Sequence, residues 1–224
     1  MNKRQKAAII FNIIIFVFTL FATISMLIGF LFMGKLMVLS EKNYMAFKYF
    51  TVDSNVFAGL LALAYVIYKL SPKGKTSSQL PEVFYILKLA ATTGVTLTMM
   101  VTVFFLAPTS HGNFLHYFTN SNFFMHLITP LFCIISFIFF EEYRPQKFLL
   151  SLTGIIPMML YSFYYIPNIL LYLENGQVPK SRDWYGFLQG GLNTVWFVLT
   201  LLYLITWIFA IGLWALNKKV SVKK

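Results

Sequence analysis

Charged side chains are scarce in this sequence of 224 residues. Only 11% of the residues are charged, whereas 58% are hydrophobic and 19% are aromatic. A soluble domain carries about 25% charged residues and needs far less apolar surface. The composition therefore excludes a soluble domain and indicates a membrane protein. Cysteine is also scarce: Cys133 is the only one, so no internal disulfide can form, and we expect it to pack as a free thiol.

Six apolar runs fill the chain, and each is long enough to cross a hydrocarbon core of about 30 Å, which takes about 20 helical residues. They cover residues 8–33, 50–70, 83–108, 123–140, 149–173 and 192–216. The first run is too long for a signal peptide, and no small-residue cleavage site follows it. The sequence therefore predicts an all-α polytopic membrane protein, in which residues 1–224 form a single transmembrane domain of six helices.

Basic residues alternate between the two sides of these runs. Twelve Lys and Arg fall at the termini and in the second and fourth loops, five fall in the other loops, and Lys88 lies within the third run. The side richer in basic residues faces the cytoplasm, so both termini should be cytoplasmic. The net charge of +11 is then explained by the excess of basic residues on the cytoplasmic side, where they attract anionic lipid, and no nucleic-acid partner is expected.

Two short polar patches interrupt the apolar runs. Residues 49–55 read Tyr-Phe-Thr-Val-Asp-Ser-Asn, and residues 122–130 contain an asparagine, a histidine and a threonine. An Asp at the centre of a membrane helix costs about 2.5–3.5 kcal/mol, so polar residues in such positions are functional candidates. Thr51, Asp53 and His126 all fall near the predicted outer ends of their helices, which places a hydroxyl, a carboxylate and an imidazole at one membrane face.

Helical phase sorts these candidates into faces. Thr51 and Asn55 share one face of the second helix, whereas Asp53 lies about 200° from Thr51 and should face elsewhere. Asn122 and His126 share a face of the fourth helix, where Asn122 could select the tautomer of His126. Three further polar residues reach the same level from other helices: Thr102, Tyr161 and Tyr165. This arrangement predicts a polar pocket that opens to the outer leaflet.

Each candidate also has a structural interpretation. Thr51 could be only the N-cap of the second helix, with Asp53 favoured there by the helix dipole. Asp53 could instead pair with Lys180 or Arg182 in the last outer loop. His126 could be a hydrogen-bonded packing residue, and the threonines of the third run and the tyrosines of the fifth could simply pack between helices.

Several of these segments occur together in an order and spacing that is typical of a known family. They are Lys-Tyr-Phe-Thr at 48–51 with Ser-Asn at 54–55, Thr-Gly-Val-Thr at 93–96 through Leu-Ala-Pro at 106–108, Met125-His126 with Pro130, Tyr161 with Tyr165, and Trp-Tyr-Gly-Phe at 184–187. The set resembles the androgen-induced-gene family of membrane hydrolases, and more closely its bacterial relatives. The resemblance covers most of the chain.

The resemblance implies a six-helix intramembrane hydrolase. Animal members of the family cleave fatty acid esters of hydroxy fatty acids with a threonine nucleophile and a histidine, and these roles correspond here to Thr51 and His126. Pro130 follows His126 by four residues, one fewer than in the animal proteins, and Glu141-Glu142 lies farther along than their glutamate. The implied partners are a lipid or fatty acid ester substrate and the surrounding membrane lipids, and no cofactor is implied.

The chemistry of the residues agrees with this expectation. A threonine hydroxyl is a poor nucleophile until a base accepts its proton, and His126 is the group in the apolar runs whose ordinary pKa suits that role. We expect Asn55, on the face of Thr51, to stabilise the oxyanion of the tetrahedral intermediate.

Two other functions remain open. One is a zinc-dependent lipid hydrolase that uses His111, His116, His126 and Asp53, although their spacing matches no ligand motif and we expect no metal. The other is a non-enzymatic transporter or lipid-binding protein with Asp53 as a proton or cation site. Against a transporter, the sequence shows no repeat symmetry and no pair of broken helices.

Overall fold

The structure is a computed structural model that describes residues 1–34, 43–77, 79–109, 114–144, 146–175, 177–179, 181–188 and 191–222. In this part of the chain, six helical segments are long and apolar enough to cross a membrane: Lys3–Ile28, Phe50–Leu70, Glu82–Leu106, Ser121–Phe140, Phe148–Leu170 and Leu192–Ser221. No β-strand occurs among the described residues. The prediction of an all-α bundle of six membrane helices is therefore confirmed.

The spans are built from α-helices joined to tighter and wider turns. The α-helices are α1 (Lys3–Ile28), α2 (Phe50–Leu70), α3 (Pro72–Thr76), α4 (Glu82–Val101), α5 (Ser121–Phe123), α6 (Thr129–Ile135), α7 (Ile156–Leu170) and α8 (Leu192–Val222). Three π-helical turns continue them: η2 (Thr102–Leu106), η4 (Phe124–Ile128) and η5 (Ser136–Phe140). The 3₁₀-helices are η1 (Asn43–Lys48), η3 (Phe114–Phe118) and η6 (Phe148–Ile155). Such π-turns are rare in proteins, and where they occur they are often at functional sites. The position of His126 in η4 therefore favours a functional role for this residue.

The first span ends earlier than hydrophobicity predicts. Apolar residues continue to Met33, but α1 ends at Ile28 because Gly29 adopts a left-handed conformation with φ 71°. Its N–H bonds to the carbonyl of Met26, as in a glycine C-cap. The helix end is thus determined by backbone conformation and not by the end of the apolar run.

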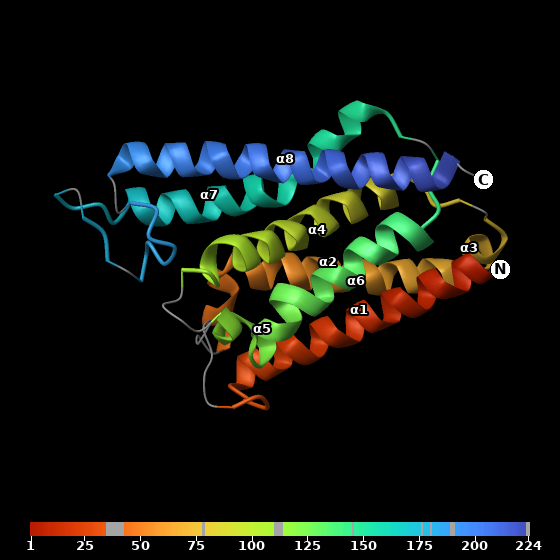
Figure 1. Ribbon diagram of the computed structural model, residues 1–224, viewed down its shortest axis with the longest axis horizontal. Coiled ribbons are helices and arrows are strands. Elements are labelled where there is room, and N and C mark those ends of the chain that lie inside the picture. The colour runs from red at the N-terminus through yellow and green to blue at the C-terminus, as the bar shows by residue number, and fades with distance from the viewer. Residues whose placement is uncertain are drawn as a thin grey trace.

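Helix α4 is the centre of the bundle. It contacts α2, α6, α7 and α8, and 67% of its apolar stretch is buried, against 22% for α8. In Figure 1, α7 and α8 lie on one side of α4 and α1 lies on the other, with α2 and α6 between. Both termini lie at the same end of the bundle (Figure 1), as six crossings require. That this end is cytoplasmic stays a prediction from the distribution of basic residues.

Glycines allow two of the helix contacts to be close. A β-carbon on Gly59 of α2 would lie 2.7 Å from Cγ2 of Thr19 on α1, and one on Gly154 would lie 2.4 Å from Cβ of Ala210 on α8. Membrane helices gain no hydrophobic effect from association within lipid, so close van der Waals packing at small residues holds them together.

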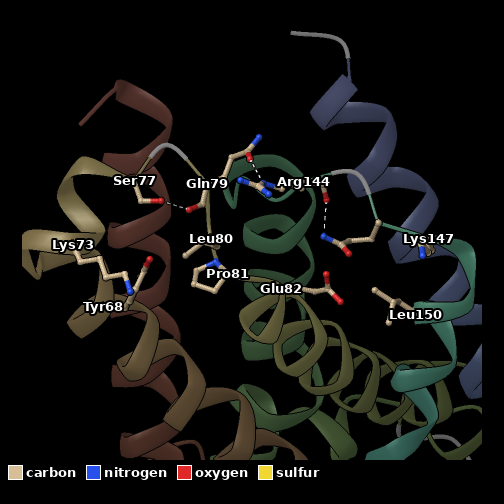
Figure 2. A pocket seen from close by; sticks show the side chains of 11 residues that line it. Tyr68, Lys73, Ser77, Gln79, Leu80, Pro81, Glu82, Arg144, Lys147 and Leu150 are labelled. Atoms are coloured by element: carbon tan, nitrogen blue, oxygen red, sulfur yellow. Dashed lines mark hydrogen bonds between the residues drawn. The ribbon is translucent and has the colours of Figure 1, made fainter.

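Three hollows among the described residues bear on the candidate sites: two beside the N-terminal half of α2 and one at the end of the bundle that carries the termini. The latter has a volume of about 750 Å³ and lies between the loops before α4 and before η6 (Figure 2). The other two meet at the first turn of α2, where the candidate site residues lie.

Candidate active site

Thr51 lies in the first turn of α2 but does not cap it. The N-cap residue is Tyr49, whose side chain makes no capping bond, and the backbone N–H of Phe50 donates instead to the hydroxyl of Tyr185 at 2.9 Å. The Thr51 hydroxyl has no hydrogen-bond partner among the described residues. The interpretation of Thr51 as an N-cap is therefore wrong, and its hydroxyl is available to a ligand.

The Thr51 side chain lines an apolar cavity of about 180 Å³. Helices α2, α4, α7 and α8 form its walls, and the segment after Asp183 contributes two aromatic rings. The polar residues on its surface are Thr51, Thr98, Thr102, Tyr161, Ser162, Tyr165 and Tyr185. The structure thus brings Thr51, Thr102, Tyr161 and Tyr165 onto one cavity, at the level expected from the sequence.

The loop that contains Asp183 holds this cavity in shape, and sequence analysis assigned no role to Asp183. The carboxylate of Asp183 accepts the N–H groups of Phe187 at 2.9 Å and Leu188 at 3.0 Å, together with the hydroxyl of Tyr165. Asp183 is 9% exposed. An acidic residue directly before the aromatic segment 184–187 was the available signal, and its role is to fold the loop over the cavity.

The Tyr161 hydroxyl fastens the same loop to the start of α2. It donates to the carbonyl of Lys48 at 2.5 Å and accepts the indole N–H of Trp184 at 3.0 Å. Burial raises the pKa of Tyr185, which therefore stays protonated at neutral pH. The predicted supporting residues Tyr161 and Tyr165 thus connect α7 to the start of α2 and to the loop of Asp183 through hydrogen bonds of their hydroxyl groups.

His126 is buried, with 2% of its surface exposed. Its Nδ1 lies 3.0 Å from the carbonyl oxygen of Tyr117. A carbonyl only accepts, so Nδ1 carries the proton and Nε2 is the basic nitrogen. Tyr117, and not Asn122 as expected, is the partner that selects this tautomer. Asn122 is itself fully buried on α5.

Asn55 connects the helix of Thr51 to the turn that carries His126. Its amide nitrogen donates to the carbonyl of Thr51 at 2.8 Å and to the carbonyl of Met125 at 3.0 Å. Both amide hydrogens are therefore used, and the expectation that Asn55 donates to an oxyanion is wrong. Its Oδ1 is buried without a partner among the described residues. His126 does not line the cavity of Thr51, and no hydrogen bond joins the two side chains in the described part of the chain.

Asp53 faces a different hollow, as helical phase predicts. This groove of about 630 Å³ lies between α2, α4 and α7, has mostly apolar walls, and shares Phe50 and Tyr161 with the Thr51 cavity. Asp53 has no ion pair or hydrogen bond to the described residues. Arg182 instead bonds to Asn168 at 3.2 Å, and Lys180 lies outside the described residues.

A metal site does not emerge from the described residues. Among them, no three His, Cys, Asp or Glu side chains gather closely enough to hold an ion. His116 lies on η3, whereas His111 lies outside the described residues. The geometry therefore offers no support for the zinc hydrolase.

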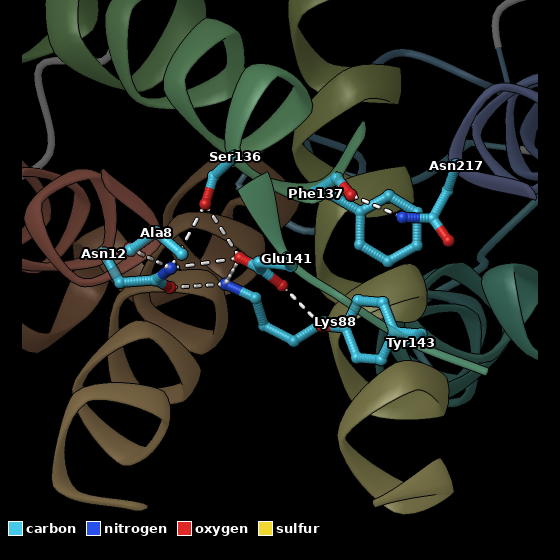
Figure 3. Close-up of polar contacts among 8 residues, drawn as sticks. All are labelled: Ala8, Asn12, Lys88, Ser136, Phe137, Glu141, Tyr143 and Asn217. Carbon is cyan, nitrogen blue, oxygen red and sulfur yellow. Dashed lines mark hydrogen bonds and ion pairs between the residues drawn. The ribbon is translucent and has the colours of Figure 1, made fainter. Parts of the chain in front are cut away.

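A second buried polar cluster lies toward the end of the bundle that carries the termini (Figure 3). Lys88 Nζ lies 2.9 Å from Glu141 Oε1 and donates to Asn12 Oδ1 at 2.7 Å. Asn12 Nδ2 and Ser136 Oγ donate to the same Glu141 oxygen at 3.0 and 2.8 Å, and the Tyr143 hydroxyl donates to the other. Sequence analysis missed this pair, although a lysine inside an apolar run needs a buried partner.

Comparison with known proteins does not assign a family. No family model matches the sequence, and no curated protein or solved structure matches the chain. The resemblance to the androgen-induced-gene family stays an expectation from the sequence, and the function has to be argued from the geometry of the site.

Proposed function

We propose that this protein is an intramembrane lipid-ester hydrolase in which Thr51 is the nucleophile and His126 the general base. The observation that carries the proposal is the Thr51 hydroxyl, which has no partner among the described residues and lies on the wall of an apolar cavity between the membrane helices. An acyl chain matches such walls, and an ester carbonyl beside Thr51 would be shielded from bulk water. The sequence also resembles a hydrolase family whose threonine and histidine correspond to Thr51 and His126, and this resemblance supports the same function.

In the first step, the Thr51 oxygen attacks the ester carbonyl carbon while its proton passes to Nε2 of His126. The tetrahedral intermediate collapses when the bond to the alcohol oxygen breaks, and His126 returns the proton to that oxygen. Water then attacks the carbonyl carbon of the acyl-Thr51 ester while His126 accepts its proton. The bond to the Thr51 oxygen breaks, His126 returns the proton to that oxygen, and the fatty acid is released. The tautomer of His126, which leaves Nε2 unprotonated, suits the first proton transfer.

Stabilisation of the oxyanion is assigned to the start of α2. Both amide hydrogens of Asn55 are occupied, whereas the N–H of Thr51 lies in the first helical turn, where backbone donors lack intrahelical partners. The positive end of the helix dipole lies there too. Asn55 instead holds α2 against the turn that carries His126. The side chains of Thr51 and His126 must approach each other when substrate binds, since catalytic contacts are commonly loose in free enzymes.

The test is covalent labelling. A long-chain fluorophosphonate should modify Thr51 in purified protein, as located by peptide mass spectrometry. Thr51→Ser should retain labelling, Thr51→Ala should lose it, and His126→Ala should slow it. Thr96→Ala is the matched control, because Thr96 is a buried threonine that bonds only to the carbonyl of Thr92. Labelling that persists in Thr51→Ala would show that another residue is the nucleophile.

Asp53 supports a second candidate, which is lipid binding without catalysis. A carboxylate without a partner among the described residues, in a groove with mostly apolar walls, suits a lipid headgroup or a proton. If Asp53→Asn removes co-purifying lipid while the fluorophosphonate labels no residue of the wild type, this candidate replaces the hydrolase.

Six apolar helices make this an integral membrane protein. We place it in a bacterial plasma membrane, on the resemblance to bacterial relatives, with the Thr51 cavity in the outer half. A cysteine introduced in place of the exposed Lys75 should be labelled from the cytoplasmic side only.

A further inference from the structure

The hollow at the end of the bundle that carries the termini is built unlike the Thr51 cavity. It lies between the chain that leads into α4 and the chain that leads into η6 (Figure 2). Its polar and charged residues are Tyr68, Lys73, Ser77, Gln79, Glu82, Arg144, Gln146 and Lys147. With about 750 Å³, it is large enough for a phosphate group with a polar substituent.

Positive charge dominates this hollow. The charged residues of its lining are Lys73, Arg144, Lys147 and Glu82, so the charges that line it sum to +2. The ammonium groups of Lys73 and Lys147 make no ion pair or hydrogen bond to the described residues. Glu82 lies in the first turn of α4, where the helix dipole stabilises an acid, and no ion pair joins it to any of the three cations. Within the described chain, these cations are therefore not neutralised by an ion pair, and a net positive charge remains in the hollow.

The arginine is held in place. Arg144 Nε donates to Oε1 of Gln79 at 3.0 Å, and Gln146 Nε2 donates to the Arg144 carbonyl at 2.9 Å (Figure 2). These bonds leave the two terminal nitrogens of the guanidinium for another ligand. A planar guanidinium with two free N–H donors matches two oxygens of a phosphate.

The flank of the hollow is apolar. Leu80, Pro81 and Leu150 contribute to its lining, and next to Lys147 the side chains of Phe148 and Leu149 are exposed by 49% and 69%. These two residues begin a membrane span, so their surroundings are lipid. A headgroup bound by Lys147 would place its acyl chains beside them.

We propose that this hollow binds a phosphate-bearing anion. Its apolar flank favours an anionic phospholipid, whose acyl chains can lie there, over a soluble phosphate. Basic pockets between membrane helices on the cytoplasmic side commonly bind such headgroups. Arg144 grips the phosphate, Lys73 and Lys147 neutralise it, and Ser77 and Tyr68 are within the lining to bond its substituent. This site is separate from the Thr51 cavity and does not depend on the hydrolase.

The first experiment measures lipid retention. Full-length protein from nanodiscs of mixed phosphatidylglycerol and phosphatidylcholine is released into detergent, and bound lipid is counted by native mass spectrometry. Arg144→Gln and Lys147→Gln should each lower retention of phosphatidylglycerol about fivefold, and Glu82→Gln should raise it. Lys3→Gln is the matched control, because Lys3 is exposed at the same end and does not line the hollow. An equal loss in Lys3→Gln would mean diffuse surface charge and overturn the proposal.

The second experiment separates a lipid from a soluble ligand. Lysine acetylation is followed by peptide mass spectrometry in phosphatidylcholine nanodiscs, alone, with inorganic phosphate, or with phosphatidylglycerol replacing part of the lipid. Phosphatidylglycerol should protect Lys73 and Lys147 but not Lys75, which is exposed two residues away and does not line the hollow. Protection by inorganic phosphate only would keep the anion site and overturn the lipid assignment. If neither phosphate nor phosphatidylglycerol protects the two lysines, both the anion site and the lipid assignment are overturned. For the variants of the first experiment, an unchanged gel-filtration profile shows that each is folded.

Discussion

Two buried polar regions of this bundle differ in how completely their groups are paired. Around Thr51, a hydroxyl without a partner faces a cavity of about 180 Å³. Around Lys88 and Glu141, the ion pair is joined by three further side chains, and neither residue lines any of the three hollows described above. In a medium without water, an unpaired polar group is costly. A fully paired cluster therefore indicates a structural connection, whereas an unpaired group on a cavity indicates a ligand.

The paired cluster connects helices that are far apart in the sequence. Asn12 belongs to α1, Lys88 to α4 and Ser136 to η5, and Glu141 and Tyr143 follow η5 directly. Burial and the charge of Glu141 raise the pKa of Tyr143, so its hydroxyl remains a donor. The cluster fixes the relative positions of three spans, and we assign it no reaction.

The largest expected effect is on catalysis at the unpaired region. Thr51→Ala and His126→Ala should each lower ester hydrolysis by at least about a thousandfold, and the double variant should lose little more, because nucleophile and base act as a unit. Hydrolysis of a long-chain p-nitrophenyl ester in detergent measures this. His116→Ala is the control. Multiplicative losses in the double variant would contradict the dyad.

The paired region should respond in stability instead. Lys88→Met leaves the carboxylate of Glu141 buried without its cation, so the free energy of unfolding should fall by about 3–5 kcal/mol. Adding Glu141→Gln should recover a large part of the loss, because the remaining groups are neutral. Denaturant unfolding in detergent measures both variants. A double variant as unstable as Lys88→Met alone would show that the pair is not the source of the effect.

Substitution of Tyr185 tests how the loop that contains Asp183 supports the start of α2. Tyr185→Phe removes the hydroxyl that accepts the N–H of Phe50, and should lower stability by about 1 kcal/mol. Because burial raises the pKa of Tyr185, its contribution should be constant below about pH 10, the pKa of an unfolded tyrosine, and should decrease above it. Tyr164→Phe is the control, since the Tyr164 hydroxyl has no hydrogen bond among the described residues. Equal losses of stability in Tyr185→Phe and Tyr164→Phe would show that the hydrogen bond from Phe50 to Tyr185 is not what stabilises the start of α2.

The smallest effect is expected at Asp53. Asp53→Asn should change ester hydrolysis by about threefold or less, because its side chain faces the larger groove and shares no hydrogen-bond partner with Thr51. The same assay used for the Thr51 variants measures it. A loss as large as that of Thr51→Ala would join the two hollows into one active site and remove the distinction drawn here.

Local patterns determined the architecture of this protein. The length of each apolar run is a property of consecutive residues, so the six spans and the shared side of the termini followed from the sequence, as did the separate faces of Thr51 and Asp53 on one regular helix. Boundaries failed where backbone conformation overrode hydrophobicity, as at Gly29.

Tertiary structure decided which groups are free and which are engaged. Asn55 lost its expected role because Met125, 70 residues away, takes one of its hydrogens. His126 is oriented by the carbonyl of Tyr117, which belongs to η3 and packs against η4, and not by Asn122. Lys88 found Glu141 across the bundle. Such pairings depend on how distant segments pack, and no periodicity within a single helix contains that information.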